Sequence, residues 1–167
     1  MVILTKYNME QISDKFFYIR CKEYKLCSSC GCKFNVIGSR KRKYINKDGE
    51  SVTLIIRRLK CSNCKRIHHE LPDILIPYKR YECSSIGNAL TDSNNSTVSA
   101  EESTIHRWTK WLNSVYIRIL IYLLSISTVG VMKSQVSYCL ILMYFYQKIY
   151  PNWLMIIVSQ LVNLDYW

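Results

Sequence analysis

Hydrophobic and polar positions alternate in the middle of the chain, where they predict strands. Residues 34–38 read as a short strand, and residues 51–59, which are rich in β-branched side chains, read as a second one. Asp48 and Gly49 lie between them, and Asp-Gly is a dipeptide typical of hairpin turns. The pattern therefore predicts a β-hairpin.

Further along, the period of the apolar positions changes to that of helices. Pro72 and Pro77 rule out a long helix before residue 78 and favour an extended connection. Residues 82–90 then predict a short helix, and polar residues 91–96 predict a loop. The next helix carries an apolar face with spacings of three and four at Ile105, Trp108, Leu112, Val115 and Tyr116.

Ser99 and Glu102 fit a capping box at the start of that second helix. A short helix, a polar loop and a capped helix form the outline of a helix-turn-helix, whose second helix enters the major groove of DNA. An ordinary amphipathic helix pair has the same outline. The candidate DNA contacts on the polar side of the second helix are Ser103, Thr104, Arg107 and Lys110.

The last third of the chain is apolar, with runs at residues 119–132, 136–146 and 153–164. Each run is shorter than the roughly 20 apolar residues that a membrane-spanning helix needs. We therefore expect a buried bundle of C-terminal helices, which braces the helix-turn-helix or forms the face of a homodimer. Insertion into a membrane is the less favoured reading.

Two C-x-x-C pairs carry the clearest chemistry in the chain. Cys27 and Cys30 form the first pair, Cys61 and Cys64 form the second, and 30 residues lie between the pairs. Two such turns that face each other place four thiolates at the corners of a tetrahedron, which is the preferred ligand set of structural Zn²⁺. Gly31 supports this reading, because the residue after such a turn often needs the backbone freedom of glycine.

Other ligands for the metal remain open. Cys32 extends the first pair to C-x-x-C-x-C, and His68 and His69 follow the second pair closely. Any of the three could replace a thiolate. A disulfide is the alternative to metal binding, but no signal peptide is visible, and eight cysteines without a secretory context favour metal ligation in the cytoplasm.

Basic residues are concentrated around this cysteine set. Residues 38–80 hold 12 Lys/Arg and 4 Asp/Glu, a balance of +8 within the total of +11. Such an excess points to a polyanion, most often nucleic acid. The candidate DNA contacts here, on the hairpin and just after Pro77, are Arg40, Lys41, Arg42, Lys43, Arg57, Arg58, Lys79 and Arg80.

The sequence gives no sign of an enzyme. Four thiolates would close the coordination shell of the metal and leave no position for an activated water. Glu70 and Asp73, and the pair Glu101 and Glu102, show no catalytic spacing, and the H-E-x-x-H motif of metalloproteases is absent. We therefore expect the zinc to be structural.

Several segments resemble an uncharacterised bacterial family that is found with mobile elements. They are RRLKCSNC at residues 57–64, IHHELPD at 67–73, PYKRY at 77–81, ESTIHRW at 102–108 and LVN at 161–163. The resemblance implies a zinc ribbon followed by a helix-turn-helix, as in the DNA-binding part of several transposases. The chain is expected to differ from those enzymes, because it lacks room for a catalytic nuclease domain after the DNA-binding part.

These observations predict an α+β fold in three parts. Residues 1–80 are expected to form a zinc-ribbon β-hairpin domain, residues 81–114 a helix-turn-helix, and residues 115–167 a C-terminal helical bundle. The predicted function is sequence-specific binding of double-stranded DNA in transposition or regulation, with a transposase or recombinase as a further partner. The alternative is a membrane-anchored or protein-interaction zinc-ribbon module.

Overall fold

The computed structural model describes residues 1–91, 98–126 and 152–163. Six strands and three helices follow one another in these residues. They are β1 (Val2–Leu4), β2 (Tyr7–Ser13), β3 (Phe16–Cys21), β4 (Phe34–Ile45), β5 (Ser51–Cys61), β6 (Ile67–Pro72), α1 (Cys83–Thr91), α2 (Glu102–Ile126) and α4 (Trp153–Asn163).

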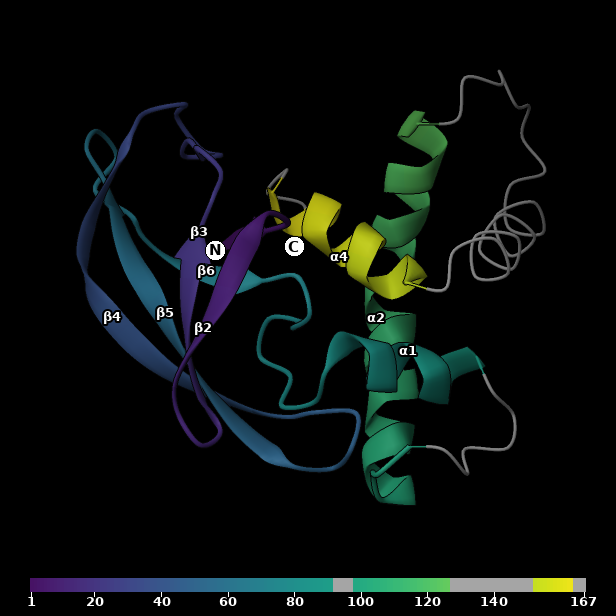
Figure 1. The fold of residues 1–167 in the computed structure, drawn as a ribbon. Coiled ribbons are helices and arrows are strands. Elements are labelled where there is room, and N and C mark those ends of the chain that lie inside the picture. The colour runs from purple at the N-terminus through teal and green to yellow at the C-terminus, as the bar shows by residue number, and fades with distance from the viewer. Residues whose placement is uncertain (92–97, 127–151, 164–167) are drawn as a thin grey trace.

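The strands form one strongly curled sheet, with the helices gathered beside it (Figure 1). β5 is its central strand. Along one edge it pairs with β4 over the whole length of both strands, and along the other edge it pairs first with β3 and then with β6. β2 extends the sheet beyond β3, and β1 extends it beyond β6. The β1–β6 and β3–β5 pairs are parallel, and the other pairs are antiparallel.

The predicted hairpin is confirmed and is longer than expected. β4 and β5 are joined by a turn in which the Asn46 carbonyl accepts the N–H of Gly49, whose φ is +81°. Glycine reaches that left-handed conformation without the steric cost that a Cβ imposes. A Cβ at Gly49 would also lie 3.1 Å from the side chain of Ser99, so the hairpin turn packs against the chain just before α2.

A cluster of buried apolar side chains lies on the concave side of the sheet. Leu54 and Ile56 of β5 lie two positions apart on the same face of the strand and point inward, where they meet Leu4, Ile19 and Leu75. Leu4, Ile19, Leu54 and Leu75 have no exposed surface. Burial of each such side chain contributes about 1.5–3 kcal/mol, so this cluster is a main source of the stability of the sheet.

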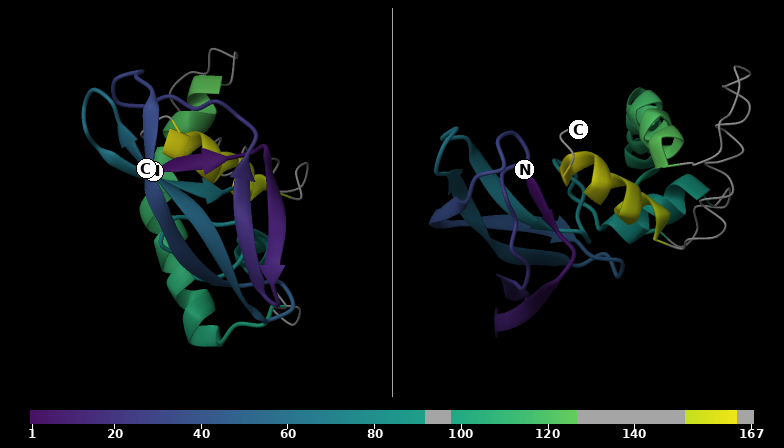
Figure 2. Two further views of the ribbon diagram at one scale, coloured as in Figure 1. Left: turned by 60° about the vertical axis from the view of Figure 1, so that its left-hand side comes forward. Right: turned by 90° about the horizontal axis from the view of Figure 1, so that it is seen from above.

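The helices lie together on one side of the sheet, as the right-hand view of Figure 2 shows. A second core joins them to the edge of the sheet. Ile3 of β1 and Ile76 pack among side chains of α1, α2 and α4, including Trp108 and Ile157. Asn163 at the end of α4 bonds both backbone groups of Ile3: its Oδ1 accepts the N–H at 2.9 Å, and its Nδ2 donates to the carbonyl at 3.1 Å.

The expected fold class is wrong. The chain does not form an N-terminal zinc-ribbon domain followed by a helix-turn-helix and a helical bundle, because its main body is the six-stranded sheet. The predicted ribbon is the end of the long β4–β5 hairpin. Three strands from residues 1–26, which were expected to belong to the ribbon domain, complete the sheet around it.

The helices are present where periodicity placed them, but their partners differ from those of a helix-turn-helix. α1 and α2 pack on each other, on α4 and on the residues that lead out of the sheet. α2 begins at Glu102, and the carbonyl of Glu101 accepts the N–H groups of Thr104 and Ile105. Ser99 therefore lies before the helix and does not cap it in the way the capping box predicts.

The apolar C-terminal runs are described only in part. Residues 153–163 of the last run form the helix α4, and residues 119–126 of the first run belong to α2. The run at 136–146 lies outside the described residues. Among the helices that the structure describes, none has both the length and the apolar character needed to cross a membrane.

One ion pair is part of the sheet itself. The guanidinium of Arg57 on β5 donates to both carboxylate oxygens of Glu70 on β6, from Nε at 2.6 Å and from Nη2 at 2.8 Å. The Glu70 side chain is 4 % exposed and that of Arg57 is 32 % exposed. This pairing raises the pKa of Arg57. Arg57, a predicted DNA contact, is thus already bound within the protein.

We expect the change Arg57→Leu to lower the free energy of unfolding by about 3 kcal/mol, because it leaves the buried Glu70 carboxylate without its partner. Urea unfolding of the metal-loaded protein measures this loss. Arg58→Leu removes the same charge at the next position of β5, on the opposite face, and should cost much less. The double change Arg57→Leu with Glu70→Leu should recover most of the loss. Equal stability of the Arg57 and Arg58 variants would contradict a structural role for the pair.

Candidate metal centre

The four predicted cysteines meet at the end of the sheet where β4 begins and β5 ends. The Sγ atoms of Cys27, Cys30, Cys61 and Cys64 all lie within 4.8 Å of one another. Sγ of Cys27 is 3.6 Å from that of Cys64, and Sγ of Cys30 is 3.4 Å from that of Cys61. Two cysteines are buried and two are half-buried. The predicted ligand set is therefore brought together.

These distances fit a tetrahedral ion site. A metal–sulfur bond of about 2.3 Å places the corners of a regular tetrahedron about 3.8 Å apart. The sulfur atoms already stand close to that separation, so an ion could enter with small movements of the side chains. Four thiols packed this closely also repel one another once they ionise, and a cation at the centre removes that repulsion. The residues present can hold a metal ion.

The two cysteine turns share one backbone design. The N–H of Cys27 donates to the carbonyl of Cys32 at 3.0 Å, and the N–H of Cys61 donates to the carbonyl of Arg66 at 3.0 Å, so each closed turn spans six residues. The residue after the second cysteine is left-handed in both turns: φ is +67° at Gly31 and +60° at Lys65. Glycine was the expected residue in the first turn, and lysine takes the same conformation in the second.

Bonds between the turns hold them face to face. The N–H of Ser62 donates to the carbonyl of Lys33 at 3.0 Å, and Arg66 Nη1 donates to Ser29 Oγ at 2.8 Å. The β4–β5 ladder also ends here, with Phe34 opposite Cys61. The sheet therefore fixes the position of the second turn relative to the first before any ion binds.

The thiols differ in acidity. The backbone N–H of Cys32 and the thiol of Cys61 lower the pKa of Cys30 to about 6. At Cys64 the N–H of Arg66 favours the thiolate, but burial and the neighbouring thiols outweigh it, and the pKa rises to about 11. Since ligands bind as thiolates, the metal has to displace protons from this cluster, and its affinity should rise with pH.

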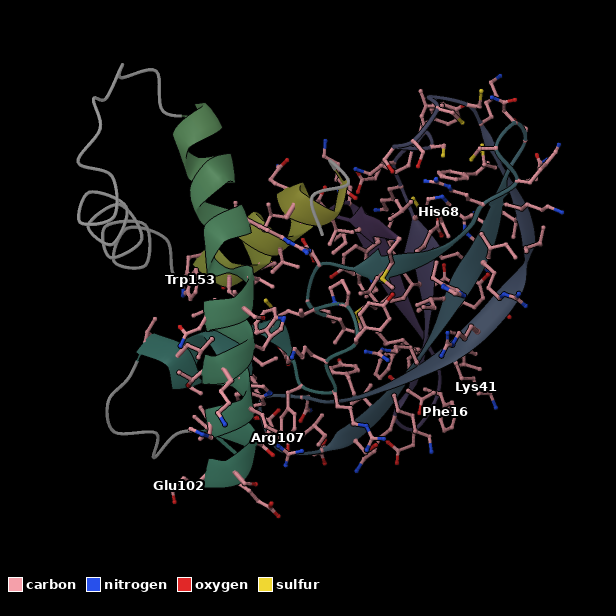
Figure 3. The ribbon with its side chains drawn as sticks, turned by 180° about the vertical axis from the view of Figure 1, so that it is seen from behind. Phe16, Lys41, His68, Glu102, Arg107 and Trp153 are labelled. Atoms are coloured by element: carbon pink, nitrogen blue, oxygen red, sulfur yellow. The ribbon has the colours of Figure 1, made fainter. Side chains whose placement is uncertain are left out.

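The alternative ligands lie around the cluster rather than in it. His68 is buried, with Nε2 at 3.9 Å from Sγ of Cys27 and its ring 5.0 Å from that of Phe34 (Figure 3). Such a contact suits a hydrogen bond to a metal-bound sulfur. Cys32 is next to the cluster without joining the group of four. His69 is on the opposite face of β6, where it lines a separate cavity.

Seven of the predicted DNA-contacting cations line two adjoining hollows. The first hollow follows the edge strand β4, and the second lies between residues 78–81 and the start of α2. Ile45 and Arg80 line both of them, so they form one continuous surface, which we call the basic groove. Its cations are Arg40, Lys41, Arg42, Lys43, Lys79, Arg80 and Arg107, and its lining contains no carboxylate.

Backbone bonds explain why these segments meet. The N–H of Ile45, at the end of β4, donates to the carbonyl of Arg80 at 2.7 Å, and the N–H of Glu82 donates back to the carbonyl of Ile45 at 2.9 Å. The Tyr81 ring then packs edge-on against Trp108 of α2, with centroids 5.0 Å apart. Lys79 lies over the ring of Trp111 at 4.4 Å.

Other predicted DNA contacts lie elsewhere. Thr104 lines the second hollow, but Ser103 and Lys110 are exposed outside the groove. Arg57 is paired with Glu70, and Arg58 stands opposite His69 on the concave face. Sequence reasoning missed Trp111, whose ring lies under the ammonium group of Lys79. The interleaved aromatics and cations of residues 78–81 were the available signal.

Residues 27–108 match the model of a family described as a domain of unknown function (DUF6431). The match begins at the first cysteine of the metal cluster and ends at Trp108. No curated protein and no solved structure matches the chain. The family-like segment thus contains the four cysteines, the long hairpin and the basic groove. A link to mobile elements stays a prediction.

We expect the purified protein to carry one metal ion per chain and the change Cys61→Ser to abolish it, because three thiolates hold the ion far less tightly than four. Cys32→Ser is the matched control and should keep the ion, since Cys32 lies outside the group of four. Elemental analysis after dialysis against a weak chelator measures both. Metal loss in the control would place Cys32 in the coordination shell.

The two left-handed positions allow a paired test of the turns. Gly31→Ala should lower the free energy of unfolding by about 1 kcal/mol, because alanine is less stable than glycine in the left-handed conformation. No steric clash adds to this effect, since the new Cβ would meet nothing within 4 Å. Lys65→Gly should raise stability by a similar amount, and Lys65→Ala controls for the lost charge. Thermal unfolding of the metal-loaded variants gives these differences. Stabilisation by both changes at Lys65 would show that charge, and not backbone conformation, decides the effect.

Proposed function

We propose that the protein binds double-stranded DNA along the basic groove and that a structural Zn²⁺ holds the frame of this groove. The single observation that carries the proposal is the continuous run of seven cations without a carboxylate. Cations on a strand, a connecting segment and a helix suit an extended polyanion better than a small ligand.

The rigidity of the groove supports this proposal. β4 is bonded along its length to β5, and its far end is bonded to the 80–82 segment. Lys and Arg side chains on a fixed backbone lose less conformational entropy when phosphates bind than they would on a loose loop. The groove cations therefore start from positions that need little rearrangement.

Zinc is the ion that the donor set suits best. Four thiolates at tetrahedral separations favour Zn²⁺ over the hard cations Mg²⁺ and Ca²⁺, which prefer oxygen. Four protein ligands also leave no open position for water, so we propose a structural role. The ion would bind the segment before β4 to the end of β5 and so stiffen the hairpin that carries the basic residues.

DNA affinity should depend steeply on salt, and removal of groove cations should reduce that dependence. The triple variant Lys43→Gln, Arg80→Gln and Arg107→Gln should lower the slope of log K against log salt by about 2.7, since each phosphate contact contributes roughly 0.9. Fluorescence anisotropy with a labelled duplex between 50 and about 200 mM salt measures the slope.

The matched control removes the same charge outside the groove, by Lys22→Gln, Lys60→Gln and Lys110→Gln, all at exposed positions. Its slope should stay close to that of the unchanged protein. Equal losses in both triple variants would mean that overall charge, and not the groove, drives binding. Stronger binding of single-stranded DNA or RNA than of the duplex would replace the proposed ligand.

A further inference from the structure

A separate cavity of about 70 Å³ lies on the concave side of the sheet, between β4, β6 and the turn at Tyr78. Its lining contains Arg40, Arg42, His69 and Tyr78, together with the apolar side chains of Met1, Ile56 and Leu71. A cavity of this size has room for a small polyatomic ion.

The register of the hairpin directs two arginines to this side. Arg40 stands opposite Ile56, and Arg42 stands opposite Leu54, and both partners belong to the buried core. Lys41 between them points to the outer face, where its Nζ lies 5.8 Å from the centre of the Phe16 ring (Figure 3). Neighbouring cations of β4 therefore point to different faces of the sheet.

One hydrogen-bond donor of Arg42 has no acceptor. Its Nη2 donates to the carbonyl of Lys79 at 2.6 Å, but its Nε is buried and has no hydrogen-bond partner. Burial, with Arg40 and Arg80 nearby, lowers the pKa of Arg42. None of the four ion pairs found among the described residues includes Arg40 or Arg42.

Such an arrangement is costly without an anion. A buried donor of a charged group that lacks a partner destabilises the protein, and neighbouring like charges add to the cost. The pKa of His69 is lowered as well, by burial and by the positive charges of Arg40 and Arg58. An anion bound beside the two guanidinium groups would offset this repulsion.

We propose that this cavity binds a phosphate group, with the guanidinium groups of Arg40 and Arg42 as its donors. Guanidinium donors match the oxygens of a phosphate, which can accept several hydrogen bonds at once. The inference deepens the proposed DNA binding and rests on it for the source of the ligand, since Arg40 and Arg42 also line the basic groove. The phosphate can come from a strand end, from the strand backbone or from solution.

The first experiment probes the cavity with inorganic phosphate alone. Titration into the metal-loaded full chain, followed through the ¹⁵N–¹H signal of Arg42 Nε, should give a saturable shift that chloride at equal ionic strength does not give. Arg40→Gln should weaken this binding about tenfold, which corresponds to roughly 1.4 kcal/mol. Lys41→Gln, the adjacent cation on the other face, should change it less than about twofold. No saturable shift, or equal effects of the two changes, would overturn the proposal.

The second experiment identifies the source and separates the two proposals. A duplex with 5′-phosphate ends is compared with the same duplex with 5′-hydroxyl ends. Tighter binding of the phosphorylated duplex, lost in Arg40→Gln, would assign the cavity to strand ends, and equal binding weakened by Arg40→Gln would assign it to the backbone. DNA binding without a response of Arg42 would overturn the phosphate cavity alone. A response to phosphate without DNA binding would overturn the proposed function and leave the cavity as a site for free phosphate.

Discussion

The fixed β4–β5 hairpin is the constraint on which the rest of the structure depends. At one end, hydrogen bonds hold two cysteine turns face to face and bring four sulfur atoms to separations that suit a metal ion. At the other end, Ile45 bonds to the 80–82 segment, and the hairpin turn packs on Ser99. A strand that is held at both ends can expose cations on its outer edge because it does not rely on their neutralisation for its shape.

Sequence reasoning succeeded where the determining interactions are local. The Asp-Gly turn, the two C-x-x-C turns and the amphipathic helix each depend on residues that are a few positions apart, so their patterns are visible in one sequence. The cysteine set was also predictable over 30 residues, because thiolate chemistry restricts which side chains can meet. The left-handed Gly31 belongs to the same group, since the geometry of the turn requires it.

Sequence reasoning failed where the fold depends on pairing between residues that are far apart in the chain. β1 is three residues long and pairs in parallel with β6, whose partners lie 68 positions further along the chain, and no local pattern marks that contact. Arg57 shows the same limit at the level of a side chain. Its basic neighbours suggested a DNA contact, but a carboxylate 13 positions later, on the neighbouring strand, binds it in the folded chain. The helices were also found but given the wrong partners, because an apolar face does not specify what covers it.

The energetic cost of a basic side chain on β4 therefore depends on the face of the sheet to which it points. On the outer side, Lys41 and Lys43 are exposed to water, and such positions cost little whether or not they bind a phosphate. On the concave side, Arg42 is half-buried next to other cations and retains an unfilled donor. Part of this side chain serves the fold, because Nη2 of Arg42 ties β4 to the carbonyl of Lys79, but that contact leaves Nε without an acceptor. The arginine at this position is most simply explained by an anion that the folded chain binds.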